Sequence, residues 1–221
     1  MIKACVFDLD GTLLNTINTI TYYANLALEH YGIEPYNTDD YKYMVGNGAK
    51  ILIERMLDGR GFSGDNEMFD KVFGFYNEKY NSDVEYLTAP YDGICELLDN
   101  LKKEGITTAV LSNKPDYAAG EAVKTFLNGY FDVVHGQHDG IEIKPSPEGV
   151  FEILNELGLT SDEILYIGDT ATDMQTGKSA NAYTIGVLWG FRLRDELEGA
   201  NADAIIEHPS EIYNILKKIN G

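Results

Sequence analysis

Two carboxylates and a glycine interrupt an apolar run near the start of the chain. The run begins at Ile2 and has the pattern of a strand entering a core, and its alternation places Asp8 and Asp10 on the same side of the backbone. Carboxylates at that spacing repel each other unless a cation lies between them or one carries a proton. Gly11 permits a sharp turn, and Thr12 offers a hydroxyl and a backbone N–H to an anion. The stretch is therefore a candidate site for a cation and an anion.

Three later clusters of polar residues are expected at the same edge of a sheet. Ser112 and Asn113 follow a buried-type strand and are expected to begin a helix, so that their hydroxyl and backbone N–H groups can hold a phosphate oxygen. Lys144 is a lone cation before a proline-containing helix start, and we expect it to neutralise a phosphate and a nucleophile. Asp169 and Asp173 follow a further apolar run. Ligands of an open parallel sheet bind beyond the carboxyl ends of its strands, so these clusters are expected to meet there.

Up to four carboxylates then converge near one point, namely Asp8, Asp10, Asp169 and Asp173. Such a group is hard to tolerate without a hard divalent cation, and Mg²⁺ fits a set of oxygen ligands. A calcium-binding loop fits poorly, because these carboxylates come from distant segments. An ordinary Asp-Gly turn and a helix-capping Asp169 are the simpler alternatives for each cluster alone, and the combination disfavours them.

The pattern from Tyr91 onward predicts an α/β protein with a Rossmann-like parallel sheet core and helices on both faces. Helix and strand signals alternate there, which is typical of a parallel sheet covered on both sides. The predicted strands span residues 2–7, 107–111, 131–134, 164–167 and 183–187, with a short edge strand at 204–206. Apolar stripes at helical spacing predict helices over 94–101, 118–126, 150–157 and 212–219.

Residues 15–86 have a different pattern and are expected to be all-helical. Helical stripes cover residues 17–31, 50–57 and 69–81, whereas 35–40 has the composition of a turn-rich connection. We therefore predict an α/β catalytic core of residues 1–14 and 87–221 with an inserted helical domain of residues 15–86. The junctions near Asn15 and Tyr86 are expected to serve as hinges.

The composition narrows the class of protein. The 221 residues carry 17 Lys and Arg against 36 Asp and Glu, and the net charge of −19 argues against nonspecific binding to nucleic acid or to an anionic membrane. No apolar run reaches transmembrane length, and Asp8 comes too early for a signal peptide, so a cytoplasmic protein is expected. Cys5 and Cys95 are expected to be reduced thiols in the core.

Taken together and in this order, four motifs resemble those of the haloacid dehalogenase-like hydrolase superfamily. They are Asp8-Leu9-Asp10-Gly11-Thr12, Ser112-Asn113, Lys144-Pro145 and Gly168-Asp169-Thr170-Ala171-Thr172-Asp173. The helical insertion resembles the small α-helical cap of the subgroup that contains phosphoglycolate phosphatases and β-phosphoglucomutases. Two further segments, Val45-Gly46-Asn47-Gly48-Ala49 and Gly186-Val187-Leu188-Trp189-Gly190, are most similar to the phosphoglycolate phosphatase branch.

The resemblance implies a mechanism for phosphoryl transfer. Asp8 would attack phosphorus in line and form an aspartyl-phosphate, and Asp10 would give a proton to the leaving oxygen and then take one from water. Mg²⁺ would be held by the carboxylate of Asp8, the main-chain oxygen of Asp10 and Asp169, with Asp173 holding a metal-bound water. The cap would close over the site and exclude bulk water.

The resemblance also implies which residues hold the substrate. The phosphoryl oxygens would contact Gly11, Thr12, Ser112, Asn113 and Lys144, and the cap residues Asn47 and Lys50 would contact the remainder of the molecule. In one place the chain departs from the family, because His135-Gly136-Gln137-His138-Asp139-Gly140 stands where relatives often have a Gly-Asp-Asp-like run. The two histidines have the pattern of surface or core residues rather than ligands. Trp189 is expected to pack beside the site without a catalytic role, and Lys114 and Arg192 receive no role at this stage.

The predicted function is a Mg²⁺-dependent phosphatase of small phosphorylated metabolites, with 2-phosphoglycolate the leading substrate and a monomer or homodimer as the assembly. The alternatives are a β-phosphoglucomutase-like phosphosugar mutase, a pyrophosphatase or another sugar-phosphate phosphatase. A dehalogenase is disfavoured, because that chemistry needs neither the second acid at Asp10 nor a metal. Outside enzymes, a phospho-switch that is modified at Asp8 and does not turn over is the remaining hypothesis.

Overall fold

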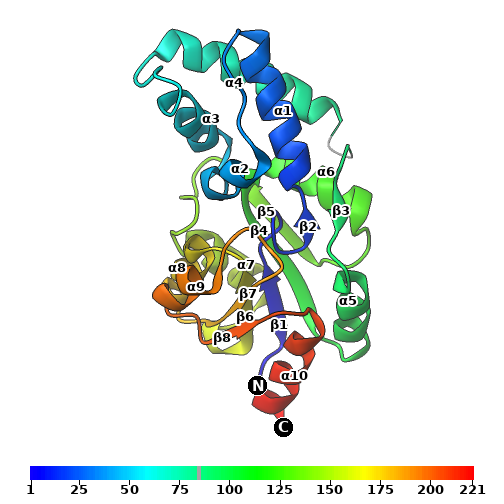
Figure 1. Cartoon of the computed structure of the whole chain (residues 1–221). Coiled ribbons are helices and arrows are strands. Elements are labelled where there is room, and N and C mark those ends of the chain that lie inside the picture. The colour runs from blue at the N-terminus through cyan, green and yellow to red at the C-terminus, as the bar shows by residue number, and fades with distance from the viewer. Residues whose placement is uncertain (84–85) are drawn as a thin grey trace. The chain divides into compact units, whose positions relative to one another are not determined.

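A computed structural model describes residues 1–83 and 86–221 and divides the chain into two compact units (Figure 1). The sheet unit comprises Met1–Asn15 and Ala89–Gly221, and the helical unit comprises Thr16–Thr88. Among the described residues, no helix combines the length and the apolar composition needed to cross a bilayer. The assignment of these units as catalytic core and cap is part of the proposal made below.

The sheet unit is built on six parallel strands in the order β5-β4-β1-β6-β7-β8. Their bounds are Ala4–Phe7 (β1), Thr107–Pro115 (β4), Val133–Gln137 (β5), Ile164–Gly168 (β6), Tyr183–Val187 (β7) and Ala204–Ile206 (β8). The central strand β1 pairs with β4 on one side and β6 on the other. This arrangement confirms the predicted α/β fold class, including the edge position of β8.

Helices cover both faces of this sheet. The side chains of β1 alternate between the two faces and therefore contact both layers of helices. Cys5 and Phe7 pack with residues of α5, α6 and α10, whereas Ala4 and Val6 pack with residues of α7 and the end of α8. The helices of this unit are α5 (Ile94–Lys103), α6 (Asp116–Phe126), α7 (Glu148–Leu157), α8 (Ala171–Ser179), α9 (Arg194–Gly199) and α10 (Ser210–Asn220), with a 3-10 turn at Ser161–Glu163. The first residue beyond β1 is Asp8, which therefore lies at the middle of the sheet's carboxyl edge.

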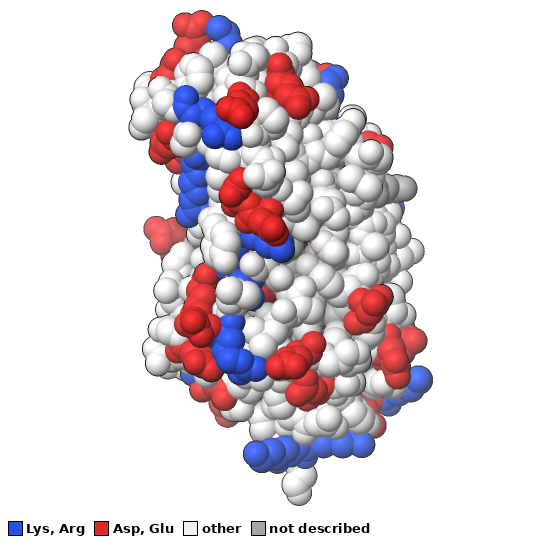
Figure 2. Space-filling model, viewed as in Figure 1, with Lys and Arg blue, Asp and Glu red and all other residues white. Residues whose placement is uncertain are grey.

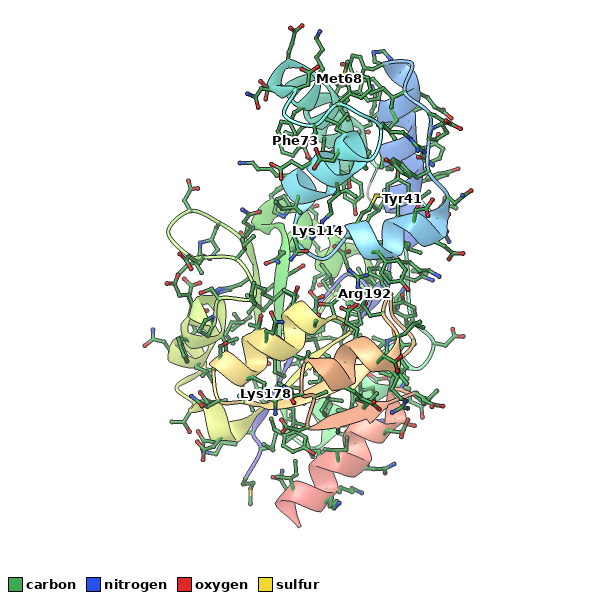
Figure 3. The ribbon with its side chains drawn as sticks, turned by 60° about the vertical axis from the view of Figure 1, so that its left-hand side comes forward. Tyr41, Met68, Phe73, Lys114, Lys178 and Arg192 are labelled. Carbon is green, nitrogen blue, oxygen red and sulfur yellow. The ribbon has the colours of Figure 1, made fainter. Side chains whose placement is uncertain are left out.

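The helical unit contains the four helices α1 (Ile17–His30), α2 (Thr38–Met44), α3 (Ala49–Asp58) and α4 (Asn66–Ser82) among its described residues. The helix α2 lies partly in the segment predicted to be a turn-rich connection, so that prediction is wrong there. A capping box between Asn37 and Asp40 starts this helix, and the buried Tyr41 anchors it by donating a hydrogen bond to Asn25 Oδ1 at 2.7 Å (Figure 3). Tertiary contacts of one aromatic side chain thus stabilise a helix whose apolar stripe is short.

Two predictions about the sheet unit are also wrong. Ser112 and Asn113 do not begin a helix, because β4 continues through them with a register shift before Pro115, and α6 begins only at Asp116. Cys5 is buried, but Cys95 is exposed, since the buried positions of α5 are Ile94, Leu97, Leu98 and Leu101. Ile94, the residue before it, faces the core, whereas Cys95 faces outward.

On the face shown in Figure 2, acidic and basic side chains are interspersed and large areas carry neither. With a net charge of −19, attraction of an anionic substrate must come from local cations rather than from the overall field.

Candidate active site

Three buried carboxylates meet at the carboxyl edge of the sheet. Asp8 follows β1, Asp169 follows β6, and Asp173 lies in the first turn of α8. Each offers one carboxylate oxygen, and these oxygens all lie within 4.8 Å of one another. Asp169 and Asp173 are fully buried and Asp8 is 6% exposed, so the three charges have almost no access to water.

Lys144 is the cation that faces this group. Its Nζ lies 2.7 Å from Asp8 Oδ1 and 2.7 Å from Asp173 Oδ1, and the side chain is almost completely buried. The second oxygen of Asp173 accepts hydrogen bonds from the backbone N–H and the hydroxyl of Thr170, at 3.1 and 2.7 Å. Asp173 is thereby fixed on both oxygens, and it holds the ammonium against Asp8.

Asn113 fixes the backbone of the segment that carries Lys144. Its Oδ1 accepts from Lys144 N at 2.8 Å, and its Nδ2 donates to Lys144 O at 3.1 Å. These two hydrogen bonds join the C-terminal part of β4 to a loop 31 residues further along the chain. Both ends of the Asn113 amide thus have a positioning contact, and the predicted phosphate contact of this residue stays a prediction.

The electrostatics of the site depend on burial more than on any single pair. Burial, together with the charge of Asp173, raises the pKa of Asp8 to about 7, although Lys144 acts against that rise. Burial, followed by the charges of Asp173 and Asp8, raises the pKa of Asp169 well above its ordinary value. Burial alone would lower the pKa of Lys144, but Asp173 and Asp8 raise it well above its ordinary range. One ammonium does not neutralise three carboxylates, so the site favours a further positive charge.

A hard divalent cation fits this set of donors. All three clustered residues offer carboxylate oxygens, which Mg²⁺ prefers, and no nitrogen or sulfur ligand belongs to the cluster. Asp169 is additionally held by a hydrogen bond from Phe191 N to Oδ2 at 2.8 Å and by the Thr12 hydroxyl, which lies 3.3 Å from Oδ1. A preformed group of oriented, buried oxygens is the expected structure of a metal site in the family that the motifs resemble.

Glycines make room for Asp169. A Cβ at Gly11, which has a φ of +93°, would overlap the Asp169 carboxylate, and a Cβ at Gly190 would overlap both Asp169 and the backbone of Gly11. The side chain of Trp189 donates from Nε1 to Thr12 O at 2.9 Å, which fixes the turn after β1 against the loop after β7. Trp189 therefore has a packing and positioning contact with the site.

Asp10 is not among the three residues whose carboxylate oxygens lie within 4.8 Å of one another, although its charge contributes to the raised pKa of Asp8. The carboxylate oxygens of Asp10 lie 3.2 and 3.3 Å from Lys114 Nζ, and its side chain is 20% exposed. Lys114 is almost fully buried at the end of β4 (Figure 3). The sequence pattern assigned Lys114 no role. Its position directly after the Ser112-Asn113 motif was the one signal that could have indicated a place in the site.

The remaining predicted residues lie in two places. Ser112 is buried, and its Oγ accepts a hydrogen bond from Lys114 N at 3.3 Å, next to the residues just described. Asn47 and Lys50 lie in the helical unit, where Asn47 Oδ1 accepts from Arg55 Nη2 at 2.9 Å and Lys50 is exposed in the first turn of α3. Their contact with a substrate stays a prediction.

Arg192 is a third buried cation among the described residues of the sheet unit, in the loop after β7 (Figure 3). Its Nε lies 3.1 Å from Glu196 Oε2, and Glu196 Oε1 accepts from Ala171 N at 3.0 Å, at the start of α8. The charge of Arg192 lowers the pKa of Asp169, although less than burial raises it. Arg192 thus ties the beginning of α9 to the segment that carries Asp169 and Asp173.

The raised pKa of Asp8 predicts how stability depends on pH when no metal is bound. The folded state holds this proton up to about pH 7, whereas the unfolded chain releases it near 3.8. The free energy of unfolding is therefore expected to fall as the pH rises from 3.8 to about 7 and to level off above that value. Denaturant unfolding in EDTA measures this dependence, and an unchanged slope in Asp8→Asn would contradict the assignment to Asp8.

Comparison with known proteins agrees with the motifs and the fold. Residues 5–187 match the haloacid dehalogenase-like hydrolase family. Phosphoglycolate phosphatase from Aquifex aeolicus (strain VF5) is 31% identical over 215 residues, which cover 97% of this chain and 96% of that protein. N-acetylmuramic acid 6-phosphate phosphatase from Pseudomonas aeruginosa is 28% identical over 221 residues, with 98% and 96% covered. A crystal structure described as a predicted phosphoglycolate phosphatase from Haemophilus somnus 129pt has a TM-score of 0.91 at 25% identity, covering 97% of this chain and 98% of its own.

The chain belongs to the haloacid dehalogenase-like hydrolase family. Within that family it is a phosphatase, which acts on a small phosphorylated substrate. Phosphatases of this family generally use a divalent metal, in agreement with the buried carboxylate group at Asp8, Asp169 and Asp173.

Proposed function

We propose that this protein is a Mg²⁺-dependent phosphatase of small phosphorylated metabolites that acts through an aspartyl-phosphate on Asp8, in the sheet unit as the catalytic core. The observation that carries the proposal is the contact of the Asp8 carboxylate with Lys144 Nζ at 2.7 Å inside a buried group of carboxylates. A nucleophilic carboxylate must be ionised and held in place, and a fixed ammonium meets both requirements.

The first step forms a bond between an Asp8 oxygen and phosphorus and breaks the bond from phosphorus to the ester oxygen. Lys144 neutralises the negative charge where nucleophile and phosphoryl group meet, and Asp173 keeps the ammonium in position through its 2.7 Å contact. A bound Mg²⁺ would supply further positive charge there, held by Asp8, Asp169 and the main-chain oxygen of Asp10, with Asp173 reaching it through water.

Asp10 is the proposed proton carrier. It gives a proton to the leaving ester oxygen in the first step and takes one from the water that splits the aspartyl-phosphate in the second. Its contacts with Lys114 at 3.2 and 3.3 Å orient the carboxylate from a segment 104 residues away. Lys114 is therefore a positioning residue for Asp10 in this proposal.

Removing the Lys114 ammonium is expected to lower kcat/KM without unfolding the protein. Lys114→Met leaves Asp10 unoriented, and a misplaced acid-base group costs roughly 10-fold to 100-fold in rate. The comparison is Lys124→Met, which removes an exposed ammonium paired with Glu121. Steady-state kinetics with a good and a poor leaving group measures the effect, which should be larger for the poor one. Equal, small effects of both variants would remove Lys114 from the mechanism.

The leading substrate is 2-phosphoglycolate, and a sugar 6-phosphate is the second candidate. Support for the first comes from the relative named phosphoglycolate phosphatase, and support for the second comes from the relative named N-acetylmuramic acid 6-phosphate phosphatase. The two substrates share a phosphate monoester and differ in the size of the remainder, so the same catalytic residues serve both. Asn47 and Lys50 are the proposed contacts for that remainder.

A panel of phosphorylated metabolites, assayed for inorganic phosphate with Mg²⁺ and with EDTA, tests the proposal. We expect release of phosphate in Mg²⁺, loss of activity in EDTA, and the highest kcat/KM with 2-phosphoglycolate. Conversion of a sugar 1-phosphate to its 6-phosphate without stoichiometric phosphate release would instead indicate a mutase. A single turnover followed by a stable phosphoprotein would indicate a phospho-switch.

A further inference from the structure

Two histidines and two glutamates form a second cluster of metal-ligating side chains, which the proposed reaction does not use. His135 lies in β5 and His138 follows that strand, while Glu152 and Glu156 lie one turn apart on the same face of α7. The ligand atoms of His135, His138 and Glu152 all lie within 4.8 Å of one another. This histidine cluster is built from the segment in which the chain departs from the usual family sequence.

Both imidazole rings direct one nitrogen at the same carboxylate oxygen. His135 Nδ1 lies 2.9 Å from Glu152 Oε2, and His138 Nε2 lies 3.1 Å from that same atom. The rings themselves have centroids 5.7 Å apart at 77°, so their edges converge on one point rather than stack. Three potential ligands of a cation thus come from two elements of the fold.

The other nitrogen of each ring already has an acceptor. His135 Nε2 lies 2.8 Å from Glu156 Oε1, and His138 Nδ1 lies 3.3 Å from the carbonyl oxygen of Asp139. A neutral imidazole carries one N–H, whereas both nitrogens of each ring face an acceptor oxygen, so in each neutral ring one lone pair faces an oxygen. A cation removes that repulsion: a metal ion beside the shared Glu152 oxygen, or an extra proton on each ring.

The surroundings have room for one ion. A cavity of about 20 Å³ is lined in part by His135, His138 and Glu152, and this volume is enough to hold a single water molecule. Ser112, Asn113 and Lys144 also line this cavity. His135 is mostly buried, with 13% of its side chain exposed, whereas His138 and Glu152 are each 32% exposed, which leaves a path for an ion to enter.

We propose that His135, His138 and Glu152 bind a divalent transition-metal ion of the zinc type, with Glu156 and the carbonyl of Asp139 orienting the two rings. Two imidazole nitrogens and one carboxylate are a ligand set that Zn²⁺ accepts and that Mg²⁺, which prefers oxygen, does not. An acceptor on the far nitrogen of each ligating histidine is the usual arrangement around such ions, because it fixes the tautomer and the ring orientation. The site is distinct from the carboxylate group at Asp8 and does not depend on the proposed reaction.

The ion would connect the end of β5 and the start of the following loop to α7. That loop carries Lys144, whose backbone is held by Asn113, another residue that lines the same cavity. Occupancy is therefore expected to stabilise the loop from both sides and to raise the midpoint of thermal unfolding.

Calorimetric titration of the full chain with Zn²⁺ in saturating Mg²⁺ tests the proposal, above the ordinary histidine pKa of about 6.5. Saturating Mg²⁺ competes with Zn²⁺ for the carboxylate group at Asp8, and the cluster variants distinguish the two sites. We expect one equivalent of Zn²⁺ to bind, a higher unfolding midpoint, and at least about a 10-fold loss of affinity in His138→Gln and in Glu152→Gln. His208→Gln is the matched control, because His208 is an exposed histidine of the same unit outside the cluster, and it should bind as the parent does.

Two further measurements keep the result interpretable. Circular dichroism without Zn²⁺ shows whether a variant is folded, and the absorption spectrum of the Co²⁺-loaded protein reports nitrogen ligands directly. Loss of the nitrogen-ligand spectrum in His138→Gln, with the fold retained, supports the site. The proposal is overturned if Zn²⁺ does not bind in saturating Mg²⁺, if the variants bind as the parent does, or if only protons occupy the cluster, so that acid raises the unfolding midpoint and Zn²⁺ does not.

Discussion

Asp8→Asn is expected to abolish multiple turnover of p-nitrophenyl phosphate, lowering kcat by at least about 10³-fold. The amide has nearly the shape of the carboxylate but lacks the charged oxygen that would attack phosphorus. Asp8 Oδ1 lies 2.7 Å from Lys144 Nζ inside the buried carboxylate group. Asp173 lies at the same distance from that ammonium, but its second oxygen is engaged by Thr170.

The same substitution has a second expected effect that separates chemistry from folding. It removes one negative charge from three buried carboxylates that face a single ammonium, so the metal-free variant should be at least as stable as the parent. Asp203→Asn is the control, since Asp203 is a carboxylate of the same unit that pairs with Lys178 away from the site. Full turnover in folded Asp8→Asn would refute the aspartyl-phosphate mechanism.

Lys144→Met is expected to impair both stability and catalysis. Removing the ammonium leaves Asp8 and Asp173 buried without their cation, and breaking a buried ion pair in this way costs about 3–5 kcal/mol. Turnover should fall by at least about 10²-fold, because the charge on nucleophile and phosphoryl group is then not neutralised. Denaturant unfolding and steady-state kinetics measure the two effects separately.

Lys178→Met is the matched control for that substitution. Lys178 also pairs with a carboxylate, that of Asp203, but both side chains are about one-third exposed, and such pairs contribute only about 0–1 kcal/mol (Figure 3). Mg²⁺ should recover part of the stability lost in Lys144→Met, because it brings positive charge to the same carboxylates, and should have no such effect on Lys178→Met. Similar losses of unfolding free energy in the two variants would show that the burial of Lys144 does not determine its contribution to stability.

The sequence predicted the parts of this protein that follow from local pattern. Strand β7 and edge strand β8 were predicted at their observed bounds, because a buried apolar run bounded by turn residues has few alternatives. The convergence of Asp8, Lys144 and Asp169 was predictable for a similar reason, since parallel strands bring their carboxyl ends to one edge of the sheet.

Long-range contacts explain what the sequence did not predict. The extension of β4 through Ser112 and Asn113 depends on hydrogen bonds to the backbone of Lys144, and no local pattern encodes a partner 31 residues away. The pairing of Lys114 with Asp10 likewise spans 104 residues. His135 and His138 were interpreted from the sequence as surface or core residues rather than ligands. Their glutamate partners lie on α7, and spacing along the chain does not show that β5 and α7 are adjacent.

The small sheet of β2 (Leu14–Asn15) and β3 (Ala89–Pro90) has a consequence for how the chain can vary. These strands pair antiparallel, with Leu14 opposite Pro90 and Asn15 opposite Ala89, so the chain leaves the sheet unit and returns to it at neighbouring positions. A segment whose two ends are fixed side by side can change in length and sequence without altering the register of the main sheet. The residues between 15 and 89 can therefore diversify as an independent module, while Asp8, six residues before β2, keeps its place beside Lys144.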